Sequence, residues 1–168
     1  MSVESIHSSL EWRLVERYGT QPATFELEDI ALLFSISAFT ATSSVEIEKQ
    51  LQRYGLSQGR FMLLLCLNVV SERTWTPATL AAAAAVSRAT ITGLLDGLEQ
   101  DTWIARTPNP NDKRSTQITL TDTGASRLEG IIPDYYGRIG DAFSDLTALE
   151  KELTGKLMRK VLDCLEKL

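Results

Sequence analysis

A short stretch of small and hydroxyl-bearing residues follows Ser87 and carries one arginine near its start. On a helical wheel, the apolar residues gather on one side (Ile91, Leu94, Leu95 and Leu98). The opposite side and its flanks hold Arg88, Ala89, Thr90, Thr92, Gly93 and Asp96, and Ser87, at the start of the helix, is a further candidate DNA contact. A helix with such a face can approach base edges in the major groove of DNA, where an arginine binds guanine or a phosphate. Taken alone, this helix fits a solvated amphipathic helix equally well.

A second group of charged residues, Asp112, Lys113 and Arg114, follows a segment rich in turn formers. The minor groove is narrow and strongly negative, so a loop that enters it needs a cation near its tip. A carboxylate two residues away can orient a guanidinium through charge-assisted hydrogen bonds. We therefore predict that Arg114 enters the groove, that Asp112 braces it and that Lys113 is a further DNA contact. The alternative is a turn with ordinary solvated charges.

The elements around these residues are predicted from caps and periodicity. Thr76 caps a short helix over residues 78–85, with proline in its first turn, and Ser87 caps a second helix that ends near Gln100. Thr76 is also a candidate DNA contact. Residues 103–107 and 115–120 read as strands joined by a loop, 108–112, too long for a tight turn. Two short helices followed by a hairpin form a winged helix-turn-helix, and this order favours DNA binding over the solvated-helix interpretation.

Longer helices are predicted on both sides of this module. Before the module, helices are predicted over residues 1–19, over residues 26–54 and after a cap at Ser57. After the module, one helix begins at Thr121 or Asp122 and is interrupted near Pro133. A last helix is opened by the capping box Thr147–Glu150. The apolar face of the last helix is wider than one small module can cover (Leu149, Leu153, Leu157, Met158, Val161, Leu162 and Leu165). Burying that face favours a partner copy.

Residues 80–124 resemble the core of the MarR family of transcriptional regulators, in the runs VSRATIT, NDKRS and LTDTG; GLSQGRFMLLLCL before them is also similar. The resemblance implies a homodimer with interleaved terminal helices, one reading helix per half-site of a pseudo-palindromic operator, and Asp112 with Arg114 as the wing pair. Asp101-Thr102 departs from the family pattern, which has glycine at the second position, and Trp103 stands where leucine is common. These changes affect the turn into the wing.

The expected fold class is mainly α with a small β-hairpin wing, a winged helix-turn-helix plus a helical dimerisation region. The expected domains are an N-terminal extension (1–25), the dimerisation region (26–56 and 122–168) and the DNA-binding domain (57–121). The net charge of −5 argues mildly against nucleic acid. The stretch from Arg73 to Arg114 holds five basic and four acidic residues, a balance of +1, so its charge permits DNA binding.

Other functions find little support in the sequence. The one histidine, His7, has no nucleophile or metal-ligand spacing beside it, so we expect no enzyme, cofactor or metal site. We find no apolar run long enough to span a bilayer and no secretory signal, so we expect a cytoplasmic protein without a membrane partner. The alternatives are a winged-helix module that binds protein, and a redox sensor that uses Cys66 or Cys164, of which Cys66 is expected to be buried.

The family resemblance also implies a small effector, often aromatic or phenolic, bound between the dimer helices and the reading head. Trp12, Arg60 and Trp75 are the candidate pocket residues. Each of them is also compatible with an ordinary core or surface position. The sequence does not identify the operator, the effector or the direction of regulation.

Overall fold

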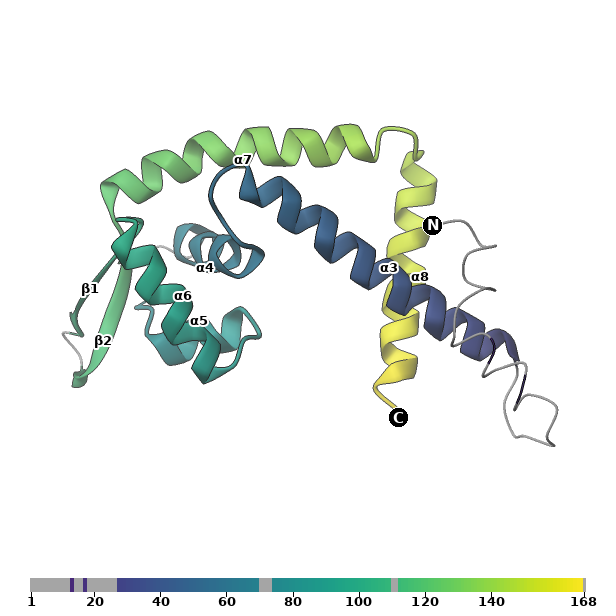
Figure 1. The fold of residues 1–168 in the computed structure, drawn as a ribbon, viewed down its shortest axis with the longest axis horizontal. Helices are drawn as coiled ribbons and strands as arrows, with labels where there is room; N and C mark the ends of the chain where they lie inside the picture. The colour runs from purple at the N-terminus through teal and green to yellow at the C-terminus, as the bar shows by residue number, and fades with distance from the viewer. Residues whose placement is uncertain (1–12, 14–16, 18–26, 70–73, 110–111, 168) are drawn as a thin grey trace. The chain divides into compact units, whose positions relative to one another are not determined.

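The computed structural model describes residues 13, 17, 27–69, 74–109 and 112–167, with the side chains of Leu27 and of residues 112–114 excepted (Figure 1). Its elements, in chain order, are α3 (Leu27–Gln52), α4 (Gln58–Val69), α5 (Pro77–Ala83), α6 (Arg88–Gln100), β1 (Ile104–Asn109), β2 (Asp112–Leu120), α7 (Asp122–Ala142) and α8 (Ala148–Leu165). The predicted fold class, mainly helical with one hairpin, is confirmed. The predicted helix over residues 1–19 lies outside the described residues, apart from Arg13 and Arg17, which are helical.

The chain divides into two compact units, residues 1–58 and residues 59–168. The predicted DNA-binding segment therefore lies almost entirely in the second unit, together with α7 and α8. The predicted grouping of residues 26–56 with residues 122–168 depends on a second copy of the chain. It stays a prediction.

The core of the second unit joins α4, α5, α6, the hairpin and α7. Its fully buried side chains include Leu63, Leu64, Leu80, Leu95, Leu98, Ile118 and Leu128. Phe61 of α4 meets Tyr135 of α7 edge to face, with ring centroids 5.0 Å apart. Gly59 gives Leu94 of α6 room to approach α4, since a Cβ at residue 59 would lie 3.1 Å from that leucine. The predicted apolar stripe of α6 is thus the side that faces the core.

Three helices end in the same way, with a residue in the left-handed conformation. Gly55, Ala85 and Thr102 have φ of 70°, 52° and 62°. After α6, the amide of Thr102 donates to the carbonyl of Glu99 (3.0 Å) and the amide of Trp103 to that of Leu98 (2.9 Å). This is the Schellman pattern, which satisfies the last carbonyls of a helix. Thr102 occupies the position where the family resemblance expects glycine, and it adopts the glycine conformation nonetheless.

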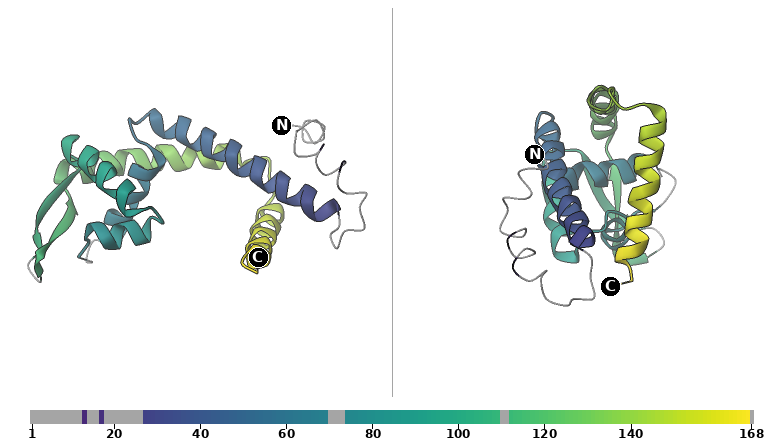
Figure 2. Two further views of the ribbon diagram at one scale, coloured as in Figure 1. Left: turned by 60° about the horizontal axis from the view of Figure 1, so that its bottom comes forward. Right: turned by 90° about the vertical axis from the view of Figure 1, so that its right-hand side faces the viewer.

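The hairpin differs from its prediction. We expected a loop over residues 108–112, but β1 runs to Asn109 and β2 begins at Asp112. The strands pair antiparallel from Ile104 with Leu120 to Pro108 with Thr116, and the register then shifts so that Asn109 pairs with Asp112. The shift leaves residues 113–115 as extra residues on β2. Pro108, Asn109 and Asp112 of the predicted loop are thus paired in the strands, and the extra residues form a bulge on β2. Figure 2 shows the two strands extending side by side beyond α5 and α6.

Pro133 does not interrupt the helix that contains it. Helix α7 is continuous from Asp122 to Ala142, as Figure 1 shows, so the predicted interruption is wrong. A proline removes one backbone donor from a helix and can be accommodated by bending. Pro133 is exposed, so a bend there disturbs no buried packing.

Helix α3 is long and apolar enough to cross a membrane by length and composition. Its segment Glu28–Gln52 contains an 18-residue window of mean hydropathy 1.6 that has no more than two charged residues. The sequence prediction concerned uninterrupted apolar runs, and α3 contains no such run of spanning length. Several serines and threonines interrupt the apolar residues, and Ser35, Ser37 and Thr40 donate to carbonyls four residues earlier. None of the window is buried within the chain.

Candidate nucleic-acid interface

Helix α5 is set by a cap that involves one of the candidate residues. Thr76 accepts from the amide of Thr79 (3.2 Å), and the amide of Thr76 donates to the hydroxyl of Thr79 (2.9 Å). With Pro77 in the first turn, this reciprocal cap fixes where the helix begins. The Thr76 side chain is half-buried and engaged in the cap, so a role in DNA binding stays a prediction.

The turn between α5 and α6 is short because Ala85 takes the left-handed conformation. The amide of Val86 donates to the carbonyl of Ala81 (3.0 Å), which closes the end of α5. Ser87 then opens α6 as predicted, since its hydroxyl accepts from the amide of Thr90 (3.1 Å). The hydroxyls of Ser87 and Thr90 also lie within hydrogen-bond distance of each other (2.7 Å).

The outward face of α6 is exposed, and the structure brings most of the candidate DNA-contacting residues together on it. The exposed ones are Ser87, Arg88, Ala89, Thr90, Thr92 and Gly93. A Cβ placed on Gly93 would meet no heavy atom of the described residues within 4 Å. The fold itself therefore does not require a glycine at this position. An open, unencumbered helix face is what close approach to a nucleic acid needs.

Acidic residues near the C-terminal end of α6 are each paired with an arginine from another element. Arg106 of β1 contacts Asp96 (2.7 Å) and Glu99 (3.2 Å), and Arg60 of α4 contacts Asp101 (2.9 Å). Sequence reasoning counted Arg106 only as a charge and did not foresee these pairs. The number of residues between Arg106 and its partners on α6 follows no helix or strand period, so the sequence gives no sign of the contact. The contact depends on where the chain reverses direction between α6 and β1.

The closing motif LTDTG joins the hairpin to α7. Thr121 caps α7 by accepting from the amide of Gly124 (2.9 Å), and its hydroxyl donates to the carbonyl of Thr102 (2.7 Å). A Cβ on Gly124 would collide with the backbone carbonyl of Trp103. Arg127 lies 5.4 Å from the centre of the Trp103 ring and donates to the carbonyl of Asp101 (3.1 Å). These contacts hold the turn into the wing against the start of α7.

The wing is anchored at its base and near its bulge. The amide of Ile118 donates to the carbonyl of Trp75 (2.8 Å), which attaches the segment before α5 to β2. Asn109, only 7% exposed, donates from its side-chain amide to the hydroxyl of Ser115 (2.8 Å) across the bulge. Lys113 and Arg114 lie in that bulge, and Asp112 pairs with Asn109. The predicted roles of these three side chains stay predictions.

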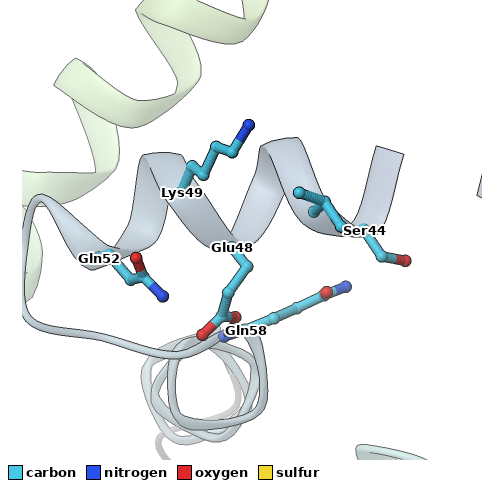
Figure 3. Close-up of a pocket in the computed structure, with 6 residues that line it drawn as sticks. Ser44, Glu48, Lys49, Gln52 and Gln58 are labelled. Carbon is cyan, nitrogen blue, oxygen red and sulfur yellow. Dashed lines mark hydrogen bonds between the residues drawn. The ribbon is translucent and has the colours of Figure 1, made fainter. Parts of the chain in front are cut away.

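Of the candidate effector residues, the structure describes Arg60 and Trp75. Trp12 lies outside the described residues. Arg60 is paired with Asp101, and Trp75 is only 4% exposed, which leaves it little surface for a ligand. A hollow of about 380 Å³ is lined by Ser44, Val45, Glu48, Lys49, Gln52 and Gln58 (Figure 3). Glu48 there accepts from the amide of Gln58 (2.8 Å), and the lining contains no aromatic residue.

The two cysteines are free. Burial raises the pKa of the Cys66 thiol, so less thiolate forms at neutral pH and the thiol reacts slowly with oxidants. Cys66 is only half-buried, which is more exposure than the sequence suggested. Among the residues that the structure describes, no cluster of histidine, cysteine or carboxylate side chains is suited to a metal ion.

Comparison with known proteins is consistent with this geometry. The profile of the MarR family matches residues 56–116. The chain is 28% identical over 148 residues to the HTH-type transcriptional repressor YetL of Bacillus subtilis (strain 168), covering 88% of this chain and 89% of that protein. Among solved structures it resembles Sco3205, a MarR family transcriptional regulator from Streptomyces coelicolor in complex with DNA (TM-score 0.74, 26% identity, 87% of this chain and 92% of that one).

A second solved structure gives the same result. A mutant of MarR from E. coli, complexed with operator DNA, has a TM-score of 0.67 and 27% identity, covering 80% of this chain and 96% of that one. The family profile spans the helix-turn-helix and most of the hairpin, and the relatives match over most of their own lengths. The chain is therefore similar to MarR family regulators in sequence and in fold.

Proposed function

We propose that this protein is a transcriptional regulator that binds double-stranded DNA as a homodimer and acts as a repressor. Helix α6 enters the major groove, and the β1–β2 wing reaches the adjacent minor groove. The observation that carries the proposal is the free outward face of α6, small and hydroxyl-bearing, beside a hairpin whose bulge holds Lys113 and Arg114. YetL is a repressor, and Sco3205 and MarR were solved with DNA, which supports this assignment.

The homodimer is supported by the apolar surface that one chain leaves uncovered. None of the residues of α8, Ala148–Leu165, is buried, and its Leu149 and Leu157 are 63% and 62% exposed. Helix α3 likewise exposes Leu32, Leu33, Phe39 and Val45. Apolar surface of this extent on a soluble chain is typical of a protein interface, and its burial stabilises by about 25 cal/mol per Å².

The proposal places the protein in the cytoplasm and assigns it no catalytic role. A small aromatic or phenolic effector is part of the proposal, with Trp12, Arg60 and Trp75 as the residues to test first. A thermal-shift screen of phenolic acids checks this part. An effector that binds the native state raises Tm with its concentration, and Arg60→Ala should remove the shift if Arg60 contacts it.

The DNA-binding claim is tested by titrating the protein against DNA from its own upstream promoter region. Gly93→Gln adds a side chain to the open face of α6, where the fold has room for it. We expect Gly93→Gln to fold with unchanged or higher stability, because glycine is a poor helix former. We expect its DNA affinity to fall at least tenfold, because a bulkier helix cannot approach the bases as closely.

Gly130→Gln is the matched control, since a Cβ on Gly130 of α7 also meets no described atom within 4 Å. It should bind DNA as the wild type does. Raising the salt concentration should weaken wild-type binding on a log–log line, which reports the number of phosphate contacts. Equal binding by the wild type and Gly93→Gln would refute the assignment of α6. If the chain captures a partner protein and binds no DNA, the result would favour the alternative function, a winged-helix module that binds protein.

A further inference from the structure

Arg106 of β1 connects the wing to α6 by two ion pairs. Its Nη2 lies 2.7 Å from Oδ1 of Asp96, and its Nη1 lies 3.2 Å from Oε2 of Glu99. The arginine side chain is 28% exposed, whereas the two carboxylate side chains are 57% and 41% exposed. Since Asp96 and Glu99 are separated by one helical turn, a single planar guanidinium spans that turn.

The two ion pairs of Arg106 matter because of the two elements that they join. Within the hairpin, Arg106 pairs with Ile118, whose amide is bonded to Trp75, so the arginine extends from the anchored part of the wing. On α6, Asp96 follows Arg88 and Thr92 at spacings of four residues, so it lies on the exposed stripe that carries them. The two ion pairs thus join the rigid base of the wing to the outward side of α6.

Covalently, the wing follows α6 through a short turn that contains the left-handed Thr102. The turn and the bond between Ile118 and Trp75 hold the base of the hairpin, but neither joins it to the side of α6 that carries Asp96 and Glu99. Two contacts one helical turn apart, both to the same guanidinium, oppose rotation of the hairpin about α6 in a way that one contact cannot. A recognition surface that is already held in its binding geometry loses less entropy when it binds.

We propose that Arg106 is a positioning residue that fixes the angle between the wing and α6, so that both reach their grooves on one duplex at the same time. This inference rests on the proposed function. It does not require that Arg106 touch DNA. Its effect on binding comes through the geometry of the two elements that do.

The test compares Arg106→Met with Arg138→Met, in the full-length protein. Methionine keeps the apolar stem and removes the guanidinium. Arg138 is the control, because it also pairs with an exposed carboxylate, that of Asp134 (3.2 Å), but both residues lie on α7 and not on the wing. Both changes remove exposed ion pairs, so we expect each to lower Tm by no more than about 4 °C.

We expect Arg106→Met to weaken binding to operator DNA about tenfold, the usual size of a coupling between two sites. Binding to a random duplex should change by less than about twofold, because it depends on phosphate contacts. Arg138→Met should leave both affinities unchanged. A loss of fold stability alone would lower both affinities in proportion, so the ratio of the two separates positioning from stability.

Arg106→Lys keeps the charge but cannot fork to both carboxylates. We expect it to restore only part of the operator affinity. Full restoration by lysine, wild-type affinity in Arg106→Met, or an equal loss in Arg138→Met would each overturn the inference.

Amide hydrogen exchange of the free protein tests, without DNA, whether Arg106 holds the wing against α6. Exchange of the β1 and β2 amides should be faster in Arg106→Met than in the wild type and unchanged in Arg138→Met. Unchanged exchange in Arg106→Met overturns the inference. If the wild type binds no DNA but exchange is still faster in Arg106→Met, the proposed function is refuted, while the role of Arg106 in holding the wing is supported.

Discussion

Two arginines, Arg88 on α6 and Arg114 on the wing, are expected to contribute to DNA binding in different ways. Arg88 is exposed in the first turn of α6, where base edges come within reach, and Arg114 belongs to the bulge of β2. A side chain that reads a base edge discriminates between sequences, whereas a cation in a narrow minor groove strengthens binding to many sequences. The two arginines therefore test the two halves of the interface separately.

Arg88→Ala should relax the base preference at one position in each half-site and cost about 1–3 kcal/mol on the preferred sequence. Arg114→Ala should weaken binding to all sequences by a similar factor and reduce the salt slope by about one. Binding titrations against an operator library with single-base changes measure both effects. Arg138→Ala, which removes an arginine paired with Asp134 on α7, is the control and should change neither. Unaltered affinity in both test variants would show that the contact assignment is wrong.

At the scale of the elements, the turn of the helix-turn-helix stores strain in a residue that could be glycine. Ala85 has φ of 52°, and the left-handed conformation costs an L-residue about 1–2 kcal/mol. We expect Ala85→Gly to raise stability by about 0.5–1 kcal/mol, after the greater entropy of the unfolded glycine is subtracted. Thermal unfolding should show a Tm about 2 °C higher.

Ala82→Gly makes the same change within α5, where the backbone is helical, and should lower stability by about 1 kcal/mol. Opposite signs for these two neighbouring substitutions are the expected result. Destabilisation by both would mean that Ala85 does not occupy the left-handed region in solution.

The capping box of α8 should make the stability of that helix depend on pH. Hydrogen bonds from the Thr147 hydroxyl and amide lower the pKa of Glu150 from its ordinary value of 4.5. A carboxylate with a lowered pKa stabilises the folded state above its unfolded pKa, and that contribution disappears as pH falls through the folded pKa. Helicity and Tm should therefore decline below about pH 4.5 by more in the wild type than in Glu150→Gln.

Glu152→Gln serves as the control, because it removes a carboxylate from the same helix without touching the cap. Its acid profile should follow that of the wild type more closely than that of Glu150→Gln. Identical profiles for the wild type and Glu150→Gln would contradict the role of the cap.

The elements could be predicted where local chemistry decides them. The caps at Thr76, Ser87 and Thr147 and the apolar stripe of α6 act over a few residues, and the structure has them where they were expected. Pro133 and the wing loop were predicted wrongly because proline and asparagine signal a break, while tertiary packing decides whether the element continues.

The contacts that position the candidate interface could not be predicted, since they join residues far apart in the chain. Arg106 meets α6 only because the turn at Thr102 reverses the chain, and Asn109 meets Ser115 only because the register shifts. Periodicity holds no information on either event. The left-handed Ala85 was also missed, because alanine is the residue that most strongly indicates a helix.

On the scale of the whole molecule, the uncovered face of α8 is the surface through which the proposed dimer would form. Glu152, Lys156, Arg159 and Asp163 line the opposite side of that helix, at spacings of three and four residues. Leu157→Glu should therefore convert the dimer to a monomer, measured by sedimentation, and Arg159→Gln should not, although it changes the net charge by the same amount. A wild-type protein that sediments as a folded monomer would contradict the dimer.

The central claim is that two copies of α6 and its wing are presented to one duplex. Native mass spectrometry of the complex with a footprinted promoter fragment tests it most directly. The account predicts two chains per duplex and two protected tracts about one helical turn apart, roughly 10 base pairs, both weakened in Leu157→Glu. One chain per duplex with a single protected tract, or full protection by the monomeric variant, would contradict it.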